Sequence, residues 1–489
     1  MKTRSQALTA LALGSWLLAG SARAQTTPTE RTAAGLVLGV IDSLQRSLAP
    51  ARNAERLSRA RDPERDRLLA RAGALWDSEF QGLSDWIGRH PEVGWQEFRA
   101  VDTLLKVLRR NGFTVDSGVA GLATAFVATW VSPAGSGGEG GGPVLGLIGE
   151  YDALRGTAGP FHGDQHNAQT PVALAAALAL KEFLIARRIP ATIRLFGTPA
   201  EEVGPPAKSI MRDAGVFRGT SLLVRSHASS QTARARAGFG SCCLNINEVK
   251  YVFSGRPSHQ LSSWNGRNAL EAAVHFFVAV DGLRSSLRPE TSIQGVIPEG
   301  GTAPNVVPDR AVVDYYIRYP DGVYLEHIQR MIDNAARGAA LATGTEVKLE
   351  PYGQYRDGIT TGMLEELKFA YARLLGASRI VEEPQRPAGY EETGGVAQDL
   401  PGVGVSVASS THPNHTMGML DDALAPVGHA GFRLDAQIMA VILYHYLTDL
   451  PFRQAVDTEH ATMRILYRQY QDNLRKAYTS EIERPSTPP

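Results

Sequence analysis

The chain has 489 residues, of which 43% are hydrophobic and 20% charged, the balance of a globular protein long enough for two or three domains. Its 50 Lys and Arg residues equal its 50 Asp and Glu residues, so bulk charge predicts neither a nucleic acid nor an acidic surface as partner. With only two cysteines, the protein has no disulfide framework and must depend on its hydrophobic cores.

The first 24 residues have the pattern of a secretory signal peptide. A basic start precedes the apolar run 7–20, and residues 22–24 (Ala-Arg-Ala) match a signal-peptidase site. The apolar run is shorter than the roughly 20 residues that a membrane span needs. We therefore predict cleavage after Ala24 and an exported protein, periplasmic or secreted, with no membrane span after cleavage.

Residues 25–70 are rich in Arg, Ala and Glu and carry a helical apolar pattern at 36–45, which predicts a helical extension with a structural role. The repeated Glu and Arg after Pro50 predict a solvated helix or hairpin there. Two amphipathic helices are predicted within 72–113, broken at His90-Pro91. Beyond them, strands alternate with helices, as in a parallel sheet covered by helices. The strands are predicted at 144–149, 191–197 and 221–227, and the helices at 172–188 and 204–215.

The pattern changes near residue 244. Between 244 and 355 the periodicity predicts strand-helix-strand twice, which is typical of a ferredoxin-like α+β module. The α/β pattern resumes afterwards, so we predict that this module is inserted into a catalytic domain formed by 71–243 and 356–455. Residues 456–489 are predicted to be a C-terminal tail. The adjacent Cys242 and Cys243 favour one or two buried strand residues over a strained disulfide.

Acidic and histidine side chains follow the predicted strands. Glu201 and Glu202 come directly after 191–197, and Asp164 and His166 lie two residues apart in H-G-D-Q-H-N. On an extended loop, Asp164 and His166 could face one pair of metal ions. A two-metal hydrolase needs several oxygen and nitrogen ligands together with one carboxylate that serves as base. One glutamate of the pair could bind metal while its neighbour, pointing elsewhere, activates a water.

Four further residues belong to the same prediction. His227 ends a predicted strand, and the segment after 402–409 contains His412 and His415, between which the spacing does not choose. Asp152 in EYDAL is a candidate to accept the second N–H of a ligand imidazole, because metal-binding histidines are commonly oriented by a carboxylate. A structural aspartate at the end of a strand is the alternative for Asp152.

Several motifs in order resemble one family, the aminoacylase/carboxypeptidase dinuclear metallopeptidases of M20 type. The similar branch is the one with the p-aminobenzoyl-glutamate hydrolase B subunit and related amidohydrolases. The resemblance runs from about residue 75 to residue 450. The matching segments are GEYDAL, H-G-x-x-H-N, P-A-E-E, S-G-R-x-x-H (254–259) and GTAPNVVPDRA (301–311).

This resemblance implies an α/β catalytic domain with a mostly parallel sheet, an inserted lid and dimerisation domain, and a homodimer. It implies two divalent ions per subunit, zinc by default, with manganese or cobalt also compatible. Glu201 would be the general base, His259 would reach a dimer mate's active site to steady the oxyanion, and Asn305 would line the substrate cleft. The implied metal ligands are Asp164, His166, Glu202, His227 and His415. The segment NHTMGM aligns His415, and not His412, with the last histidine ligand of the family.

Asp164 departs from the branch, which usually has cysteine at this position. A carboxylate makes the site richer in oxygen and removes an oxidisable thiolate, so the metal identity is open. The run TGGVAQD also lacks the branch's usual S-T-D. Three arginines, Arg256, Arg267 and Arg310, are candidates to bind a substrate carboxylate.

The predicted function is that of an exported metal-dependent amidohydrolase. Its substrate would be an N-acyl or N-aroyl amino acid or a small dipeptide-like amide, cleaved by a water that two metal ions activate. The alternative is a binding or scaffold protein that kept the fold and lost the activity. Every implied ligand position holds a competent residue, which favours the enzyme.

Overall fold

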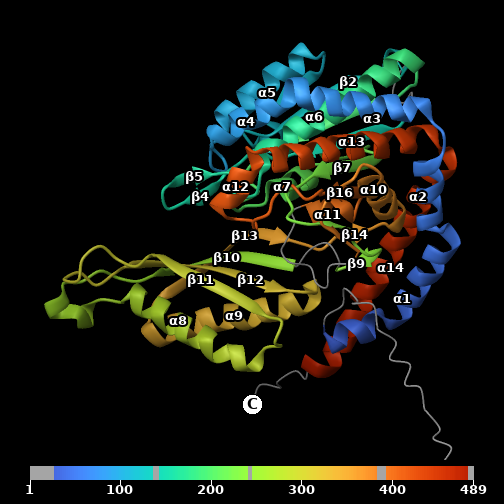
Figure 1. The fold of residues 1–489 in the computed structure, drawn as a ribbon. Coiled ribbons are helices and arrows are strands. Elements are labelled where there is room, and N and C mark those ends of the chain that lie inside the picture. The colour runs from blue at the N-terminus through green and yellow to red at the C-terminus, as the bar shows by residue number, and fades with distance from the viewer. Residues whose placement is uncertain (1–26, 136–141, 241–244, 383–392, 483–489) are drawn as a thin grey trace, which may run out of the picture.

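The computed structural model describes residues 27–135, 142–240, 245–382 and 393–482. An α/β domain and a smaller α+β domain lie one above the other in Figure 1. The predicted fold class, a mostly parallel α/β catalytic domain with an inserted ferredoxin-like module, is confirmed. The predicted signal peptide and the pair Cys242-Cys243 lie outside the described residues.

The catalytic domain is built on a six-stranded sheet of order β1-β2-β6-β3-β7-β16. Its strands are β1 (Thr114–Ser117), β2 (Phe126–Val131), β3 (Val144–Gly149), β6 (Thr192–Gly197), β7 (Leu222–Ser226) and β16 (Gly402–Val405). Strands β6, β3, β7 and β16 are parallel, whereas β1 and β2 form an antiparallel edge. The carboxyl ends of four neighbouring strands therefore meet at one edge.

Both faces of this sheet are buried, because apolar residues on β3 alternate between two cores. Leu145 and Leu147 point to one core, whereas Ile148 points to the other. Helices α3 (Pro63–Leu75), α4 (Gln81–Arg89), α5 (Phe98–Arg110), α6 (His166–Arg187), α10 (Gly362–Leu374) and α13 (Pro426–Thr448) contribute to the first core. Helices α7 (Ala207–Asp213) and α11 (Thr393–Ala397) contribute to the second.

Among the described helices, α6 alone is long and apolar enough to cross a membrane by composition. Its apolar window is 78% buried inside the protein, between the sheet and the helices α3, α4 and α13. Those apolar residues are therefore accounted for by the domain core.

The inserted module is a four-stranded antiparallel sheet of order β11-β12-β10-β13 with two helices on one face. In chain order the elements are β10 (Asn245–Ser254), α8 (Ala269–Leu283), β11 (Ser292–Glu299), β12 (Arg310–Tyr319), α9 (Gly322–Thr343) and β13 (Glu346–Tyr355). Its core is rich in aromatic rings, with Phe276 packing against both Tyr251 and Tyr315. The minor strands are β4 (Leu154–Gly156), β5 (Gly159–Phe161), β8 (Thr232–Ala233), β9 (Gly238–Phe239), β14 (Ile359–Thr360) and β15 (Ile380–Val381).

Both ends of the described chain are helical and pack into cores. The helical extension predicted at 25–70 forms α1 (Pro28–Leu48), α2 (Pro50–Arg59) and the start of α3. The segment after Pro50, predicted as a solvated helix or hairpin, is helical and buries Ala54 and Leu57 in the first core. The tail predicted at 456–489 is largely the helix α14 (Leu450–Ile482). Charged residues dilute the apolar stripe of α14, which becomes a core face when α14 packs against α1 and the inserted module.

The helices α1 and α14, called here the terminal helix pair, run side by side along the inserted domain (Figure 1). Val37 and Ile41 of α1 and Leu474 of α14 belong to the same core as the aromatic rings of the inserted module. Hydroxyl groups of α14 also bind buried carboxylates, since Tyr478 donates to Asp321 at 2.6 Å. The terminal helix pair thus completes the core of the inserted domain.

Candidate metal centre

Carboxylates and imidazoles gather where the parallel strands end, the edge at which open α/β sheets place their ligands. The contributing strands are neighbours in the sheet, so residues distant in sequence become adjacent. Glu150 and Asp152 follow β3, Glu201 and Glu202 follow β6, His227 follows β7 and His415 lies beyond β16. Asp164 and His166 come from the turn that joins β5 to α6.

His166 opens helix α6, so it is not on the extended loop that its spacing with Asp164 suggested. The intervening Gln165 has a φ of 56°, and this left-handed residue turns the chain into the helix. Both Asp164 and His166 nevertheless face the same group of side chains. A tight turn into a helix has brought them together where the sequence suggested an extended loop.

Asp152 links two of the predicted ligands. Its Oδ1 lies 3.0 Å from Nδ1 of His166, and its Oδ2 accepts a hydrogen bond from the backbone N–H of Glu202 at 2.9 Å. Burial alone would lower the pKa of His166, but the charges of Glu150 and Asp152 raise it well above its usual value. One buried carboxylate therefore orients an imidazole and anchors the loop that carries the glutamate pair.

Asp164, Glu202 and His415 form one group whose ligand atoms lie within 4.8 Å of one another. Nε2 of His415 is 3.4 Å from Asp164 Oδ2 and 3.7 Å from Glu202 Oε2. Nε2 of His227 reaches the same Asp164 oxygen at 4.0 Å. Burial raises the pKa of Glu202 to about 7, and the negative charge of Asp164 adds to this rise.

Glu201 and Glu202 converge on His166 as a second group, which differs from the expectation that the two side chains would point apart. The preceding residue, Ala200, has a φ of 56° and donates its N–H to buried Glu97 at 2.8 Å, which fixes the turn. Burial raises the pKa of Glu201 well above its usual value, and the charge of Glu150 raises it further. Glu201 is therefore a carboxylate that can readily accept a proton.

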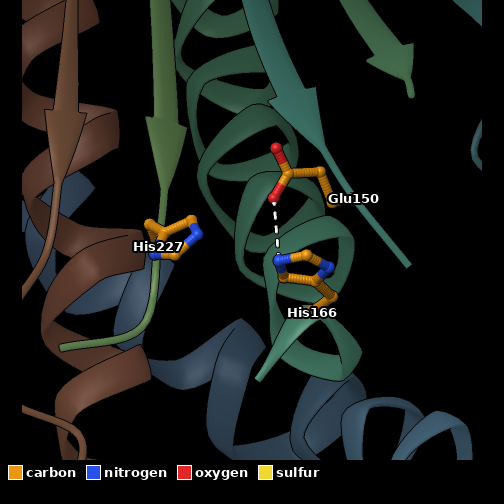
Figure 2. A group of neighbouring side chains, drawn as sticks. All are labelled: Glu150, His166 and His227. Carbon is orange, nitrogen blue, oxygen red and sulfur yellow. Dashed lines mark ion pairs between the residues drawn. The ribbon is translucent and has the colours of Figure 1, made fainter. Parts of the chain in front are cut away.

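Glu150 and Lys208 are polar residues of this edge that sequence reasoning missed. Glu150 comes from the end of β3, His166 from the first turn of α6 and His227 from beyond β7, and Figure 2 shows the three side chains together. Oε2 of Glu150 is 3.2 Å from Nε2 of His166, and its Oε1 is 2.5 Å from Nζ of Lys208. The signal was present in GEYDAL, where a glutamate ends a buried strand two residues before Asp152.

The remaining predicted residues lie elsewhere. His412 Nδ1 is 2.9 Å from Asp422, and His412 is outside the ligand groups found among the described residues. His259 and Asn305 are exposed neighbours on the inserted domain, where the N–H of Gln260 donates to the Asn305 carbonyl. Within the described chain, no hydrogen bond or ion pair joins either of them to the ligand groups.

Of the three candidate arginines, Arg310 is engaged in an ion pair, 2.8 Å from Glu299 on the neighbouring strand β11. Arg256 and Arg267 pair with each other through backbone hydrogen bonds at the edge of the inserted domain.

The donor set fits divalent metal ions. Two ligand atoms that are each about 2.1 Å from one ion, at angles of about 90–110°, lie roughly 3.0–3.4 Å apart. The Glu150–His166 distance of 3.2 Å and the Asp164–His415 distance of 3.4 Å match this spacing. Nε2 of His166 is also buried and makes no hydrogen bond in the described structure, as expected of an atom that serves as a metal ligand.

This fold and this site define a metal-binding hydrolase, and comparisons with known proteins specify the class. The peptidase dimerisation domain of M20 enzymes matches residues 239–343. The mouse Xaa-Arg dipeptidase is 30% identical over 374 residues, which cover 75% of this chain and 81% of that protein. The B subunit of the p-aminobenzoyl-glutamate hydrolase from Escherichia coli is 32% identical over 286 residues, covering 55% of this chain and 56% of its own.

Solved structures share the fold at lower identity. An aminobenzoyl-glutamate utilization protein from Klebsiella pneumoniae aligns with a TM-score of 0.59 and 18% identity, over 78% of this chain and 99% of that one. A dinuclear metal binding peptidase of the M20 family from Bacillus subtilis aligns with a TM-score of 0.50 and 19% identity, over 75% of this chain and 98% of that one.

The chain belongs to the M20 family of metallopeptidases and amidohydrolases. It is an amidohydrolase that acts on amides of amino acids, which confirms the predicted enzyme class.

Proposed function

We propose that this protein is exported and hydrolyses the amide bond of a small N-acyl or N-aroyl amino acid, or of a dipeptide-like substrate, at a pair of divalent metal ions. One observation carries the proposal: Glu202 belongs both to the group with Asp164 and His415 and to the group with His166 and Glu201. Two groups that share a carboxylate can hold two neighbouring ions with a base beside them.

The proposed ligands are Asp164, His166, Glu202, His227 and His415. When bound, such ions lower the pKa of a water molecule and polarise the scissile carbonyl. Zinc suits the mixture of imidazole and carboxylate, and the carboxylate of Asp164 makes manganese or cobalt equally compatible. Measuring the activity of metal-free protein reconstituted with each ion separates these cases.

Glu201 is the proposed general base. Its carboxylate takes a proton from the attacking water, holds it, and returns it to the leaving amine. The raised pKa suits this role, because a carboxylate with an ordinary pKa would hold a proton too weakly near neutral pH. Asp152 keeps the His166 ring oriented during the cycle.

We further propose that His259 and Asn305 act in the active site of a second copy of the chain, His259 by steadying the oxyanion and Asn305 by lining the cleft. Their exposure on the inserted domain supports this homodimer. Leu261 and Trp264, which follow His259, are each 75% exposed, an unusual extent for large apolar side chains on a surface that nothing covers.

The substrate proposal draws on the names of the relatives. The mouse protein is a dipeptidase for Xaa-Arg, and the Escherichia coli protein hydrolyses p-aminobenzoyl-glutamate. A screen of Xaa-Arg dipeptides, p-aminobenzoyl-glutamate and N-acyl amino acids with metal-reconstituted protein should find hydrolysis of at least one class. Each class joins an acyl group to an amino acid with a free carboxylate, which an arginine such as Arg256 or Arg267 could bind.

The decisive test is the Glu201→Gln variant. It should keep two ions per chain and lose about 10²–10⁴-fold in kcat, because the proton acceptor is gone while the ligands remain. The matched variant Glu202→Gln should lose metal as well as activity. Retained turnover in Glu201→Gln contradicts the base assignment. Fewer than one divalent ion per wild-type chain favours the inactive binding protein.

Export has its own test. The protein isolated from its native host should begin at Gln25 when the N-terminus is sequenced, since cleavage is expected after Ala24. A mature chain that still begins at Met1 contradicts this part of the proposal.

A further inference from the structure

Glu150 has no role in the mechanism above, although it is fully buried at the metal edge of the sheet. Its Oε1 lies 2.5 Å from Nζ of Lys208, which is also fully buried. Its Oε2 accepts a hydrogen bond from Gln169 and lies 3.2 Å from Nε2 of His166. The carboxylate is thus held in one orientation with one oxygen directed at a proposed ligand.

The contact between Glu150 and His166 needs a positive charge at the ring, either a second proton or a metal ion. Nδ1 of this imidazole faces Asp152, and Nε2 faces Glu150, so both ring nitrogens lie next to carboxylate oxygens. A neutral imidazole has only one N–H. If Nδ1 donates that proton to Asp152, Nε2 presents a lone pair to another lone pair, and nothing in the described structure hydrogen-bonds to Nε2. A metal ion between the two atoms removes this conflict, and in the metal-free protein a second proton on the ring does the same.

His227 supplies the third atom. Glu150, His166 and His227 form a group whose ligand atoms lie within 4.8 Å of one another, and the two imidazole rings meet edge to face with centroids 5.6 Å apart (Figure 2). This group shares no residue with Asp164, Glu202 and His415. The chain therefore offers three ligands to each of two ions.

We propose that Glu150 is a sixth metal ligand, which together with His166 and His227 would bind one of the two ions. Lys208 is then a positioning residue for the Glu150 carboxylate. By holding Oε1, Lys208 leaves only Oε2 for the ion and offsets part of the negative charge. This inference rests on the proposed two-ion function and assigns that site a residue beyond the five ligands.

The competing explanation is an ordinary buried ion pair that only stabilises the fold. The chain contains a matched example in Glu365 and Lys368, 2.6 Å apart on α10, whose side chains are 8% and 10% exposed. Removing one partner of either pair leaves a buried charge without its neighbour, which destabilises the protein in both cases. Only Glu150 should also change the binding of metal.

The first experiment measures metal affinity by titrating metal-free protein with Zn²⁺ and Mn²⁺. Glu150→Gln should weaken one of the two binding events by roughly tenfold to a hundredfold or more and leave the other unchanged, whereas Glu365→Gln should change neither. Substitution with Co²⁺ adds a spectroscopic readout, because the visible absorption of one cobalt ion should change in Glu150→Gln. Unchanged affinities and spectra in this variant overturn the proposal.

The second experiment covers the case in which Glu150→Gln does not fold. The double variant Glu150→Gln/Lys208→Met removes both charges, which buried pairs commonly tolerate, and should show the same single weakened site. In Lys208→Met alone, Glu150 has lost its lysine, and a bound metal ion would be the cation in direct contact with its carboxylate. Metal should therefore raise the Tm of Lys208→Met by more than it raises that of the wild type, and an equal rise contradicts the proposal.

The outcomes separate this inference from the proposed function. A wild-type protein that binds no divalent ion refutes both. A wild type that binds two ions, beside a Glu150→Gln variant that binds both as tightly, refutes only the role of Glu150.

Discussion

Two regions bury carboxylates in this protein, and their surroundings shift the pKa of Glu150 and that of Asp357 in opposite directions. At the metal edge of the sheet, burial alone would raise the pKa of Glu150, but Lys208 and His166 hold it below the usual range. At the junction with the inserted domain, Asp357 accepts hydrogen bonds from the Tyr467 hydroxyl at 2.7 Å and from the backbone at 3.1 Å, and burial raises its pKa to about 6.

The difference shows what each region is built for. Cations near Glu150 keep that carboxylate charged and available to a metal ion. The neutral donors around Asp357 serve a structural purpose, since they fasten α14 to the chain segment that re-enters the catalytic domain. Glu201 and Glu202 are exceptions at the metal edge, since burial raises the pKa of both, and for Glu201 this agrees with the role of proton acceptor.

Among the variants that compare the two regions, the largest effect is expected from Asp152→Asn. An asparagine cannot balance the charge of a metal-bound imidazole, so metal affinity and kcat/KM should each fall by roughly 10–100-fold. Calorimetric titration of the metal-free protein and steady-state kinetics measure both quantities. Asp357→Asn is the control at the junction and should leave metal affinity unchanged. If the two variants lose metal equally, the distinction between the regions fails.

An intermediate effect concerns pH and the junction. Because the pKa of Asp357 is near 6 in the folded protein and near 4 when unfolded, the folded state holds more protons between these values. This group therefore makes the protein less stable as pH rises from about 4 to 6, by on the order of 2 kcal/mol.

Asp357→Asn should remove that contribution. The Tm of the variant minus that of the wild type should increase as pH rises from 4 to 6.5 and stay level above, in thermal melts of metal-free protein. A difference that stays constant with pH would show that the junction carboxyl is already charged at pH 4.

The smallest effect is expected from His412→Ala, at the border of the metal region. The His412–Asp422 contact is half-exposed, with 50% of the imidazole accessible, and such pairs contribute about 0–1 kcal/mol. Metal content and kcat should stay within about twofold of the wild type. His415→Ala should instead lose metal, and loss of metal in both variants would extend the ligand set to His412.

Much of the fold followed from sequence because its signals are local. Buried strands such as 144–149 and the doubled strand-helix-strand pattern after residue 244 predicted the layers and the insertion correctly. The strand ends also predicted where Glu202 and His415 would lie, since the carboxyl ends of parallel strands meet at one edge. Asp164 joins them from the turn between β5 and α6.

The remainder depended on contacts between distant residues. Glu150 and Lys208 are both fully buried and are 58 positions apart on different elements, so no local pattern showed that they would form an ion pair. Likewise, the apolar stripe of α14 is diluted by charge, and it becomes a core face through a partner more than 400 residues away. Local patterns carry no information about such pairings.

The terminal helix pair also has a consequence for the order of folding. The inserted domain is formed by residues from the middle of the chain, yet its core includes side chains from the first and last described helices. Contacts across so long a stretch form slowly, because the loop between them must close first. During synthesis the inserted domain therefore keeps an incomplete, apolar flank until α14 leaves the ribosome, and a chaperone that shields this flank would protect the nascent protein from aggregation.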